Sequence, residues 1–581
     1  MEKLVIKKAP AANQAPPNWY LTAKYGLYVT WAFEGKNTAD GCGCYPDGSL
    51  PKSHNEMVDA FDVESFANDC KDMNIEYVNL TSYHANMFVL YPSKVVEEML
   101  PGHTCRRDLL KEIADALHQR GIRLQVYIHA TIGDSMTEED RARTHWYDAE
   151  DGYKKWNDWH NLFFDEMAKR YAGVIDSYYI DMIFDKPFLT MIDQKRLKQT
   201  LQAYDPNVLV IGNGEANAAV DFGSREDAMT LIDNEDDRLA YPVQTVISLT
   251  GKWWSLQPST AASAVLYTPR HLYRTLVLTA SANVGGGGMA IGASPYVTRG
   301  FEPGSKETIV ALGQLVAPVA KSIKGTLPST SYITPAGASI KTLPHGIVAT
   351  ASPCGKYEYI HVLTPPKSDT LVLPVPRDKK QFKSAVVLPS NTPVQFAQNS
   401  DGLKISIEGE WDALDTVLCL EVLETPQLAY TIAPFAKQSC TAHSPKPLPQ
   451  HEAEKAIDND PSTFFCSSGS TLTEIVLDLG SEQEVCRVRV LPRQDGTGFE
   501  EMITHICTYS LHTSCDGKEY TAVASGEWPR TAEEKSACFP AIQARFVKLV
   551  SGPEWLPDFF WGFSPKASAA EIDVDIVVNS F

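Results

Sequence analysis

The sequence lacks an excess of positive charge and a long apolar segment, and each absence removes a class of protein. Its 52 Lys and Arg face 72 Asp and Glu, which gives a formal charge of −20 at pH 7. Such a chain repels phosphate backbones, so we expect no nucleic-acid partner. No stretch reaches the ~20 consecutive apolar residues of a membrane helix, so we expect no membrane insertion.

The N-terminus also lacks an apolar run of signal-peptide length. The compartment stays open, since a removed leader would place the protein in a periplasm or outside the cell. The 12 cysteines form no paired C-x-x-C units and are too sparse for a disulfide scaffold, and we interpret Cys42-Gly43-Cys44 as part of a loop.

What the sequence does contain is an ordinary globular composition in a chain too long for one core. Of its 581 residues 44% are hydrophobic. At ~150 residues per domain, this length predicts three or four domains.

From about Tyr25 the sequence alternates short β-branched or aromatic runs with segments of helical period, which is typical of a parallel sheet. In the segment 108–120, Leu109, Ile113 and Leu117 mark an apolar helix face and Gly121 follows as a stop signal. No G-x-G-x-x-G follows the first strand, so a doubly wound dinucleotide fold is disfavoured and a (β/α)8 barrel is expected. The expected strands are residues 26–31, 76–82, 123–130, 176–181, 208–213, 243–249, 276–283 and 289–293.

Helical periodicity ends after an expected helix over residues 308–323, and short strands between Pro and Gly turns follow to about Leu423. This pattern predicts a β-sandwich. A Pro-rich polar stretch near residues 439–450 then precedes another all-β region. The expected domains are a catalytic barrel over 1–326, a β-sandwich over 327–430 and a third domain over 431–581.

An acidic residue ends the fourth expected strand, where side chains project into the active site of a barrel. This residue is Asp181. Retaining hydrolysis of a glycosidic bond needs a nucleophilic carboxylate and a second carboxyl about 5 Å away. By position alone, the candidates for the second group are Asp185, Glu215, Glu226, Asp233 and Glu235.

Several segments resemble, in the same order, motifs of the GH29 α-L-fucosidases. They are KYGLYVTW at 24–31, the segment 61–94 with LTSYHANMF, DSYYIDM at 176–182, the Gly-rich run 283–295 and the helix 313–326. The resemblance implies a retaining exo-glycosidase with Asp181 as nucleophile. DFGSRE at 221–226 resembles the hexapeptide that holds the acid/base in some members, which favours Glu226, with Glu215 and Glu235 as alternatives. No metal or other cofactor is expected for catalysis.

The positions that hold fucose in that family are altered here. A family His falls on Thr30, an adjacent His pair falls on Tyr83-His84, and an Arg falls on Gly214 or Glu215. L-Fucose therefore stays open as the substrate; the alternatives are a retaining glycosidase for another sugar and a catalytically silent lectin-like protein. The expected substrate-binding residues are Thr30, Trp31, Tyr83, His84 and Trp254.

Residues from about 433 to 581 resemble the discoidin, or coagulation factor 5/8 type C, domain, a jelly-roll β-sandwich whose bacterial relatives bind carbohydrate. The resemblance rests on AIDNDPSTF at 456–464, VLDLG at 476–480, PRQDG at 492–496, SCDG at 514–517, ARFV at 544–547 and AAEI at 569–572. It implies an oligosaccharide or glycoconjugate partner and a structural Ca²⁺ near the carbonyl of Lys455. The implied side-chain ligands are Asp458, Asp460, Thr463 and Glu571. Trp555, Phe559, Phe560 and Trp561 are candidates for stacking on a sugar.

Overall fold

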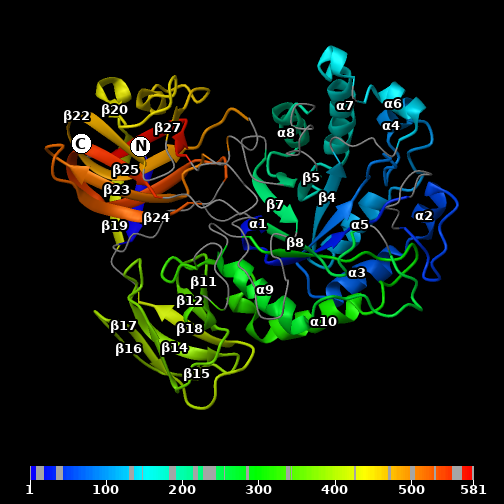
Figure 1. Ribbon diagram of the computed structural model, residues 1–581, viewed down its shortest axis with the longest axis horizontal. Coiled ribbons are helices and arrows are strands. Elements are labelled where there is room, and N and C mark those ends of the chain that lie inside the picture. The colour runs from blue at the N-terminus through cyan, green and yellow to red at the C-terminus, as the bar shows by residue number, and fades with distance from the viewer. Residues whose placement is uncertain are drawn as a thin grey trace.

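The computed structural model shows three bodies built on separate sheets (Figure 1). It describes residues 2–7, 19–33, 43–129, 136–146, 148–181, 192–213, 220–226, 244–253, 256–282, 287–334, 341, 343–423, 427–468, 473–496, 501, 504–528, 531–552 and 566–578.

The first body is a closed barrel of parallel strands, which confirms the expected architecture. Its interior is filled by aromatic side chains, among them Tyr28, Tyr77, Tyr127 and Tyr179. These bulky rings leave a packed core rather than a pore, so a ligand is confined to the mouth. The strands are β2 (Tyr25–Val29), β3 (Tyr77–Thr81), β4 (Arg123–His129), β5 (Ser177–Asp181), β6 (Leu209–Asn213), β7 (Phe222–Glu226), β8 (Gln244–Ser248) and β9 (Met289–Gly292).

Helices surround the barrel, and α5 shows why the sequence forms them. The Asp108 side chain caps its first turn by accepting from the Lys111 amide at 3.1 Å, and Gly121 beyond its end has a φ of 70°. The helix expected at 308–323 begins earlier, as α10, and continues as the 3₁₀ helix η3. The elements are α1 (Trp19–Thr22), α2 (His54–Ala60), α3 (Val63–Asp72), α4 (Lys94–Met99), α5 (Leu109–His118), α6 (Glu138–Thr144), η1 (Ala149–Asp151), α7 (Lys154–Arg170), α8 (Gln194–Gln202), α9 (Pro269–Ala282), α10 (Ser305–Val316) and η3 (Ala317–Ser322).

The strand expected at 276–283 is wrong. This segment forms the C-terminal half of helix α9, and the sixth barrel strand, β7, was not expected. Leu276, Val277 and Leu278 are all fully buried because α9 lies between the barrel and the second body. A helical segment that is buried on every side lacks the exposed polar face of an amphipathic helix, so it could not be distinguished from a buried strand.

The second body packs two antiparallel sheets against each other, as expected for a β-sandwich. The six-stranded sheet contains β10 (Leu327–Pro328), β11 (Ile347–Ala351), β12 (Tyr357–Val362), β18 (Thr416–Val422), β14 (Phe382–Leu388) and β15 (Thr392–Pro393). The three-stranded sheet contains β13 (Thr370–Leu373), β17 (Gly402–Ser406) and β16 (Gln395–Asn399). The short 3₁₀ helix η4 (Pro344–Gly346) precedes β11.

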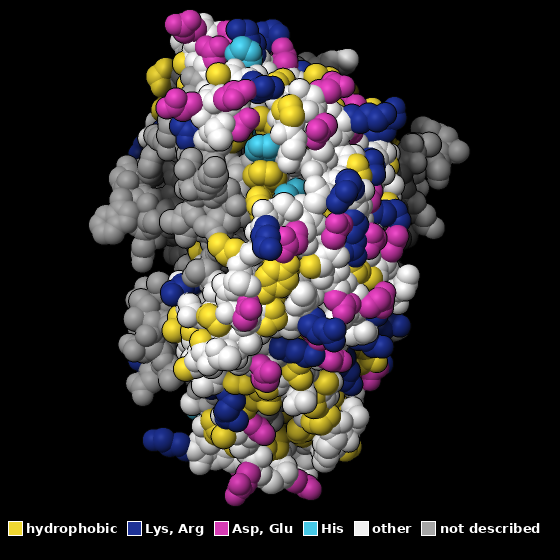
Figure 2. All heavy atoms as spheres, turned by 90° about the vertical axis from the view of Figure 1, so that its right-hand side faces the viewer, with side chains coloured by type: hydrophobic (Ala, Val, Ile, Leu, Met, Phe, Trp, Pro, Cys, Tyr) yellow, Lys and Arg dark blue, Asp and Glu magenta, His cyan; other side chains and the backbone are white. Residues whose placement is uncertain are grey.

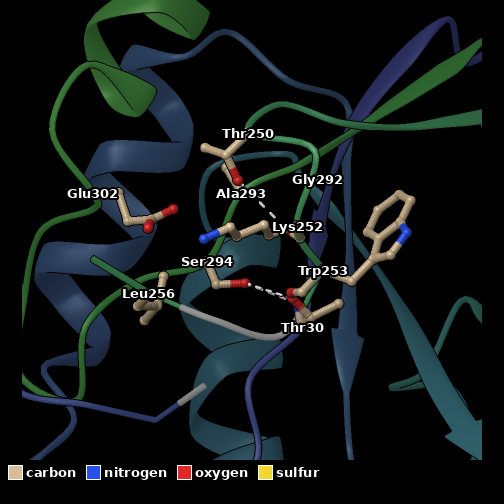
Figure 3. Close-up of a pocket in the computed structure, with 9 residues that line it drawn as sticks. All are labelled: Thr30, Thr250, Lys252, Trp253, Leu256, Gly292, Ala293, Ser294 and Glu302. Carbon is tan, nitrogen blue, oxygen red and sulfur yellow. Dashed lines mark hydrogen bonds between the residues drawn. The ribbon is translucent and has the colours of Figure 1, made fainter. Parts of the chain in front are cut away.

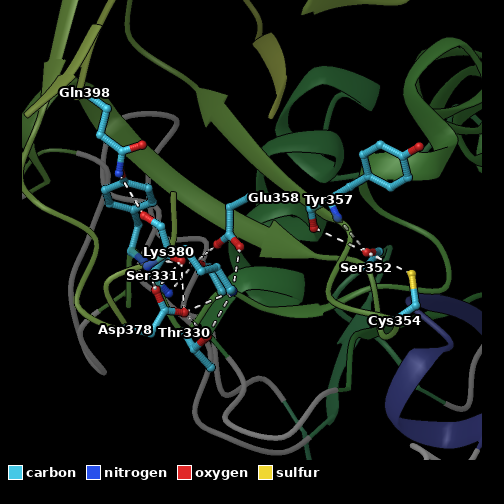
Figure 4. A network of polar contacts seen from close by, with 11 residues as sticks. Thr330, Ser331, Ser352, Cys354, Tyr357, Glu358, Asp378, Lys380 and Gln398 are labelled. Carbon is cyan, nitrogen blue, oxygen red and sulfur yellow. Dashed lines mark hydrogen bonds and ion pairs between the residues drawn. The ribbon is translucent and has the colours of Figure 1, made fainter. Parts of the chain in front are cut away.

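A buried ionic network connects Glu358 of β12 with loop residues of the second body (Figure 4). Lys380 Nζ lies 3.1 Å from Glu358 and 3.0 Å from Asp378, and Thr330 donates to Asp378 at 2.7 Å. Burial raises the pKa of the Glu358 carboxyl, and Lys380 opposes that rise. Because every charge has a partner, we assign the network to the fold rather than to chemistry.

The third body is the C-terminal β-sandwich, and its main sheet includes the start of the chain. Strand β1 (Glu2–Lys7) pairs antiparallel with β19 (Gln427–Pro434), so the N- and C-termini lie in one body (Figure 1). The other elements are β20 (Thr441–His443), β21 (Phe465–Cys466), β22 (Thr473–Leu491), β23 (Thr508–Ser514), β24 (Thr521–Glu527), β25 (Lys535–Ser551), β26 (Ser568–Ala569), β27 (Glu571–Val577), η5 (Lys437–Ser439) and η6 (Ala453–Ala456). The exact domain limits at 326/327 and 430/431 stay a prediction.

Candidate active site

Asp181 is the last residue of β5 and lies at the carboxyl end of the barrel. Tyr127 of β4 donates its hydroxyl hydrogen bond to Oδ2. Asn213, the last residue of β6, donates from Nδ2 to Oδ1 at 2.5 Å. Both carboxylate oxygens therefore accept from neighbouring strands, which fixes the plane of the carboxylate while 13% of the side chain stays accessible.

Two histidines lie beside this carboxylate. His129, at the end of β4, has its Nε2 3.7 Å from Asp181 Oδ2, and the ring of His84 is 4.7 Å from that of His129. Burial lowers the pKa of each to about 3. Both rings are neutral near pH 7, so neither neutralises the charge of Asp181 as an ion-pair partner. The expected binding residue His84 thus lies in the neighbourhood of the expected nucleophile.

The other expected binding residues occupy different environments. The ring centroid of Trp31 lies 4.8 Å from that of Phe61, and the ring centroid of Tyr83 lies 5.3 Å from that of Phe163. Both Trp31 and Tyr83 are buried in the main hydrophobic core. Thr30 donates to the carbonyl of Trp253, and its Oγ1 also lies 3.0 Å from Ser294 Oγ. The roles of these residues in sugar binding stay predictions.

The second carboxylate is not placed by the structure. Asp185, Glu215, Asp233, Glu235 and Trp254 lie outside the described residues, and Glu226 is described only by its backbone, as the last residue of β7. The choice of Glu226 as acid/base therefore stays a prediction.

Sequence reasoning missed three residues at this end of the barrel: His129, Asn213 and Trp253. The first two are the last residues of β4 and β6, so the rule that selected Asp181 was sufficient to find them. The indole ring of Trp253 lies 5.5 Å from the ring of Tyr28, measured between centroids. The indole also packs closely on Gly292, since a side chain there would place its Cβ 2.7 Å from the indole. The contact joins residues far apart in the sequence, so no local pattern marks Trp253, and the prediction of Trp254 stays untested.

A polar pocket opens beside Trp253 (Figure 3). Glu302 is 7% exposed, and its carboxylate accepts a hydrogen bond from the backbone N–H of Gln257 at 2.5 Å. Lys252 is exposed. Burial raises the pKa of the Glu302 carboxyl, and Lys252 opposes that rise. The pocket is small and is lined by Thr30, Thr250, Lys252, Trp253, Leu256, Gly292, Ala293, Ser294 and Glu302.

The acidic turn of the C-terminal body brings part of the expected calcium ligands together. Thr463 donates to Asp458 at 2.7 Å, and the amide of Asp460 donates to the same carboxylate at 3.0 Å. Burial raises the pKa of the Glu571 carboxyl, and the nearby charges of Asp573 and Asp458 add to that rise.

Lysines neutralise part of this charge. Lys437 forms an ion pair with one oxygen of Glu571, and Lys455 lies 3.5 Å from Asp458. The other oxygen of Glu571 is buried without a hydrogen-bond partner. Within the described ranges, no group of three or more His, Cys, Asp and Glu converges as a metal site. The unpartnered Glu571 oxygen is the feature of this turn that fits a cation.

Over those same ranges, no helix is long and apolar enough to cross a membrane.

A barrel with a carboxylate fixed at its carboxyl end, joined to β-sandwich bodies, has the architecture of a modular glycoside hydrolase. Residues 52–317 match the family model described as alpha-L-fucosidase, and residues 439–555 match that of the F5/8 type C domain. The barrel is therefore similar to the α-L-fucosidases among the glycoside hydrolases, and the C-terminal body is similar to the F5/8 type C domain.

Known proteins share these parts. An α-L-fucosidase of GH29 from Bacteroides thetaiotaomicron is 16% identical, with 71% of this chain and 99% of that chain covered, at a TM-score of 0.50. Another structure from that organism, of an α-L-fucosidase GH29 trapped covalent intermediate, is 16% identical, with 72% and 99% covered, at a TM-score of 0.50. At this identity the likeness shows the fold.

Among curated proteins, a sialidase from Micromonospora viridifaciens is 28% identical over 130 residues. The match covers 21% of this chain and spans 18% of the length of that relative.

Proposed function

We propose that the protein is a retaining exo-glycosidase that removes a terminal sugar related to L-fucose. The observation that carries this proposal is Asp181, fixed by two donors at the end of β5. The family of the barrel supports the reaction class. The trapped covalent intermediate of the Bacteroides enzyme supports a mechanism through a glycosyl-enzyme.

In the first step an oxygen of Asp181 attacks the anomeric carbon, and the bond from that carbon to the leaving oxygen breaks. Glu226 supplies the proton that the leaving oxygen takes up. In the second step Glu226 accepts a proton from water as the water oxygen attacks the anomeric carbon, and the bond to Asp181 breaks. Tyr127 and Asn213 hold the attacking carboxylate throughout, because they donate from rigid strands.

We propose that this site holds the hydroxyls of its sugar with other residues than the α-L-fucosidases use for L-fucose. The hydroxyl of Thr30, at the position of a family His, donates to the carbonyl of Trp253. It therefore supports a loop, and His84 beside Asp181 is the imidazole available to a substrate. A glycan-binding protein without catalysis is the second candidate, and this same replacement at Thr30 is what favours it.

The experiment is an assay of aryl glycosides, including α-L-fucoside, with the parent, Asp181→Ala and Asp115→Ala, an exposed carboxylate on α5. We expect Asp181→Ala to lose at least about 10³-fold in kcat, since it removes the nucleophile. Asp115→Ala should match the parent. Turnover that survives in Asp181→Ala contradicts the mechanism, and a parent inactive on every sugar favours the glycan-binding alternative.

The acid/base assignment is tested with Glu226→Ala on an activated aryl glycoside. Azide should restore turnover, because it replaces the water that the missing base would activate. If azide does not restore turnover in Glu226→Ala, Glu226 is not the acid/base, and Glu215 or Glu235 takes that assignment.

For the C-terminal domain we propose glycan binding and a structural Ca²⁺ at Asp458, Asp460, Thr463 and Glu571, with the Lys455 carbonyl. The partnerless buried oxygen of Glu571 supports the ion, because a hard cation takes oxygen ligands of this kind. We expect Ca²⁺ to raise Tm relative to EDTA in the parent and not in Glu571→Gln. Equal Tm values with and without Ca²⁺ in the parent would show that Lys437 and Lys455 alone hold the turn.

A further inference from the structure

Buried polar groups lie behind the Asp181 carboxylate, on the side of strand β4. His129 ends that strand, and its side chain is 2% exposed. Its Nε2 lies 3.7 Å from Asp181 Oδ2, whereas the other ring nitrogen, Nδ1, is buried without a hydrogen-bond partner among the described residues. Because a buried polar atom that stays unpaired costs free energy, the surroundings of Nδ1 bear on the function of this ring.

Helix α7 carries a second imidazole in the same condition. His160 is 1% exposed, and neither of its nitrogens has a hydrogen-bond partner in the part of the chain that the structure describes. Aromatic rings of its own helix hold it, with centroid distances of 3.9 Å to Trp156, 5.0 Å to Trp159 and 5.3 Å to Phe164. The outer face of the molecule to the right in Figure 1 carries interspersed acidic and basic side chains (Figure 2). His160 is enclosed instead, so it does not meet a ligand from solvent.

Helix α7 packs on the barrel at the level of His129. The register of the parallel strands β3 and β4 places Tyr83 and His129 at the same height. The ring of Tyr83 is 5.3 Å from that of Phe163 on α7, measured between centroids. His160 precedes Phe163 by three residues and so shares its face of the helix. Burial lowers the pKa of His160 to about 3, and the nearby His129 adds to that fall.

The position of one proton decides how His129 acts on Asp181. A neutral imidazole has one N–H donor and one acceptor nitrogen. With the proton on Nε2, the N–H dipole of His129 stabilises the carboxylate at 3.7 Å. With the proton on Nδ1, a lone pair faces the carboxylate instead. A donor to Nδ1 therefore selects the tautomer that favours the charged nucleophile.

We propose that His160 is a positioning residue that fixes the tautomer of His129, so that His129 presents Nε2–H to Asp181. His160 supplies the N–H that Nδ1 of His129 accepts, directly or through one ordered water. The dipole of His129 then stabilises the charge that returns to Asp181 when its bond to the sugar breaks. The inference rests on the proposed glycosidase function and adds a residue that acts on the nucleophile from a helix outside the barrel.

The first test is ¹⁵N NMR of the protein labelled with ¹⁵N-histidine at pH 7.5, where both rings are neutral. The shifts of the ring nitrogens distinguish the two tautomers, and His129→Phe assigns the signals of His129. We expect Nε2–H on His129 in the parent and in His160→Gln, whose amide keeps an N–H donor. In His160→Phe the Nδ1–H tautomer should become populated. His54→Phe is the matched control, because His54 is also buried with both nitrogens unpartnered.

The second test is a double-mutant cycle on the best aryl glycoside. We expect His160→Phe to lower kcat about fivefold at unchanged KM, since it weakens one interaction with a charged group. In a His129→Phe background the same change should have no further effect, because His160 acts through His129. His160→Gln should recover most of kcat, and His54→Phe should match the parent.

Nδ1–H on His129 in the parent overturns the inference without any variant, so the inference stays testable even if His160→Phe does not fold. It is also overturned if His160→Phe slows the His129→Phe enzyme as much as the parent. The Tyr83 hydroxyl is another buried group without a hydrogen-bond partner, and a tautomer that shifts in Tyr83→Phe but not in His160→Phe contradicts the role of His160. If the parent cleaves no glycoside, the glycosidase function is wrong, while the NMR result still decides whether His160 controls His129.

Discussion

At the scale of single residues, the site depends on how the Asp181 carboxylate is held by its neighbours. Tyr127 and Asn213 donate to its two oxygens, and the imidazole of His129 lies 3.7 Å from Oδ2. The nucleophile of a retaining glycosidase has to present one oxygen along a fixed line to the anomeric carbon. Tyr127 and Asn213 supply that constraint.

Removing either donor should slow the reaction without abolishing it. We expect Tyr127→Phe and Asn213→Ala each to lower kcat about tenfold, since a hydrogen bond to a charged group contributes about 1.5 kcal/mol. Steady-state kinetics on the best aryl glycoside measures this. Tyr77→Phe is the matched control, because the Tyr77 hydroxyl is buried in the same barrel without a hydrogen-bond partner. If Tyr127→Phe behaves like Tyr77→Phe, the contact to Asp181 has no catalytic role.

Position along the strand made Asp181 predictable, whereas its partners were not recognised. A residue that ends a barrel strand projects into the mouth whatever its identity, and an acid there is conspicuous. Asn213 obeys the same rule, but an amide carries no chemical signal by itself. The contact between Thr30 and the Trp253 carbonyl joins residues 223 positions apart, so no local pattern could show it.

At the scale of elements, alternation between apolar runs and helical segments was enough for most of the barrel. Strands such as β4 and β5 are short apolar runs between clear helices. Strand β7, with the sequence FGSRE, has only one large apolar residue and no alternation. Helix α9 is buried on all sides, so its segment had strand-like composition.

Helix α7 contains a buried histidine that should make the fold sensitive to acid. His160 packs between Trp156 and Phe164, and both of its nitrogens are buried without hydrogen-bond partners. Burial lowers its pKa from 6.5 to about 3. The unfolded chain therefore binds a proton below about pH 6.5 that the folded chain rejects. The stability contribution is complete above that pH and is lost as pH falls toward 3.

His160→Phe should remove this dependence. Lowering the pH from 7.5 to 5.5 should cost the parent about 1.4 kcal/mol of unfolding free energy through His160, and the variant should be spared that loss. Urea unfolding at the two pH values measures the difference. His443→Phe, at an exposed position, serves as the control. Equal losses in the parent and His160→Phe would show that His160 is solvated or protonated in the fold.

At the scale of the whole molecule, the chain closes on itself. Strand β1 pairs with β19 from Glu2 opposite Ile432 to Lys7 opposite Gln427, and β19 then pairs with β27. The first strand therefore covers an edge of the C-terminal sheet, which would otherwise expose unpaired backbone groups.

Deleting Glu2–Lys7 should loosen the C-terminal sheet and leave the second body unchanged. We expect faster amide exchange in Gln427–Pro434, because its backbone loses a partner strand, and a lower Tm for the C-terminal body. Hydrogen–deuterium exchange of the full chain and the deletion variant measures this. Peptides from β14 and β18 provide the internal control. Unchanged exchange in β19 would show that β1 contributes nothing to the sheet.

The sequence by itself determined the barrel, the two β-rich bodies after it and the carboxylate at the end of β5. These features follow from local periodicity and from where a strand ends, both of which a chain carries in its residue order. Only the tertiary structure decided what surrounds Asp181, that Lys252 and Glu302 face one pocket, and that β1 joins the C-terminal sheet. Those pairings depend on segments distant in the sequence meeting in space, and no local pattern encodes such a meeting.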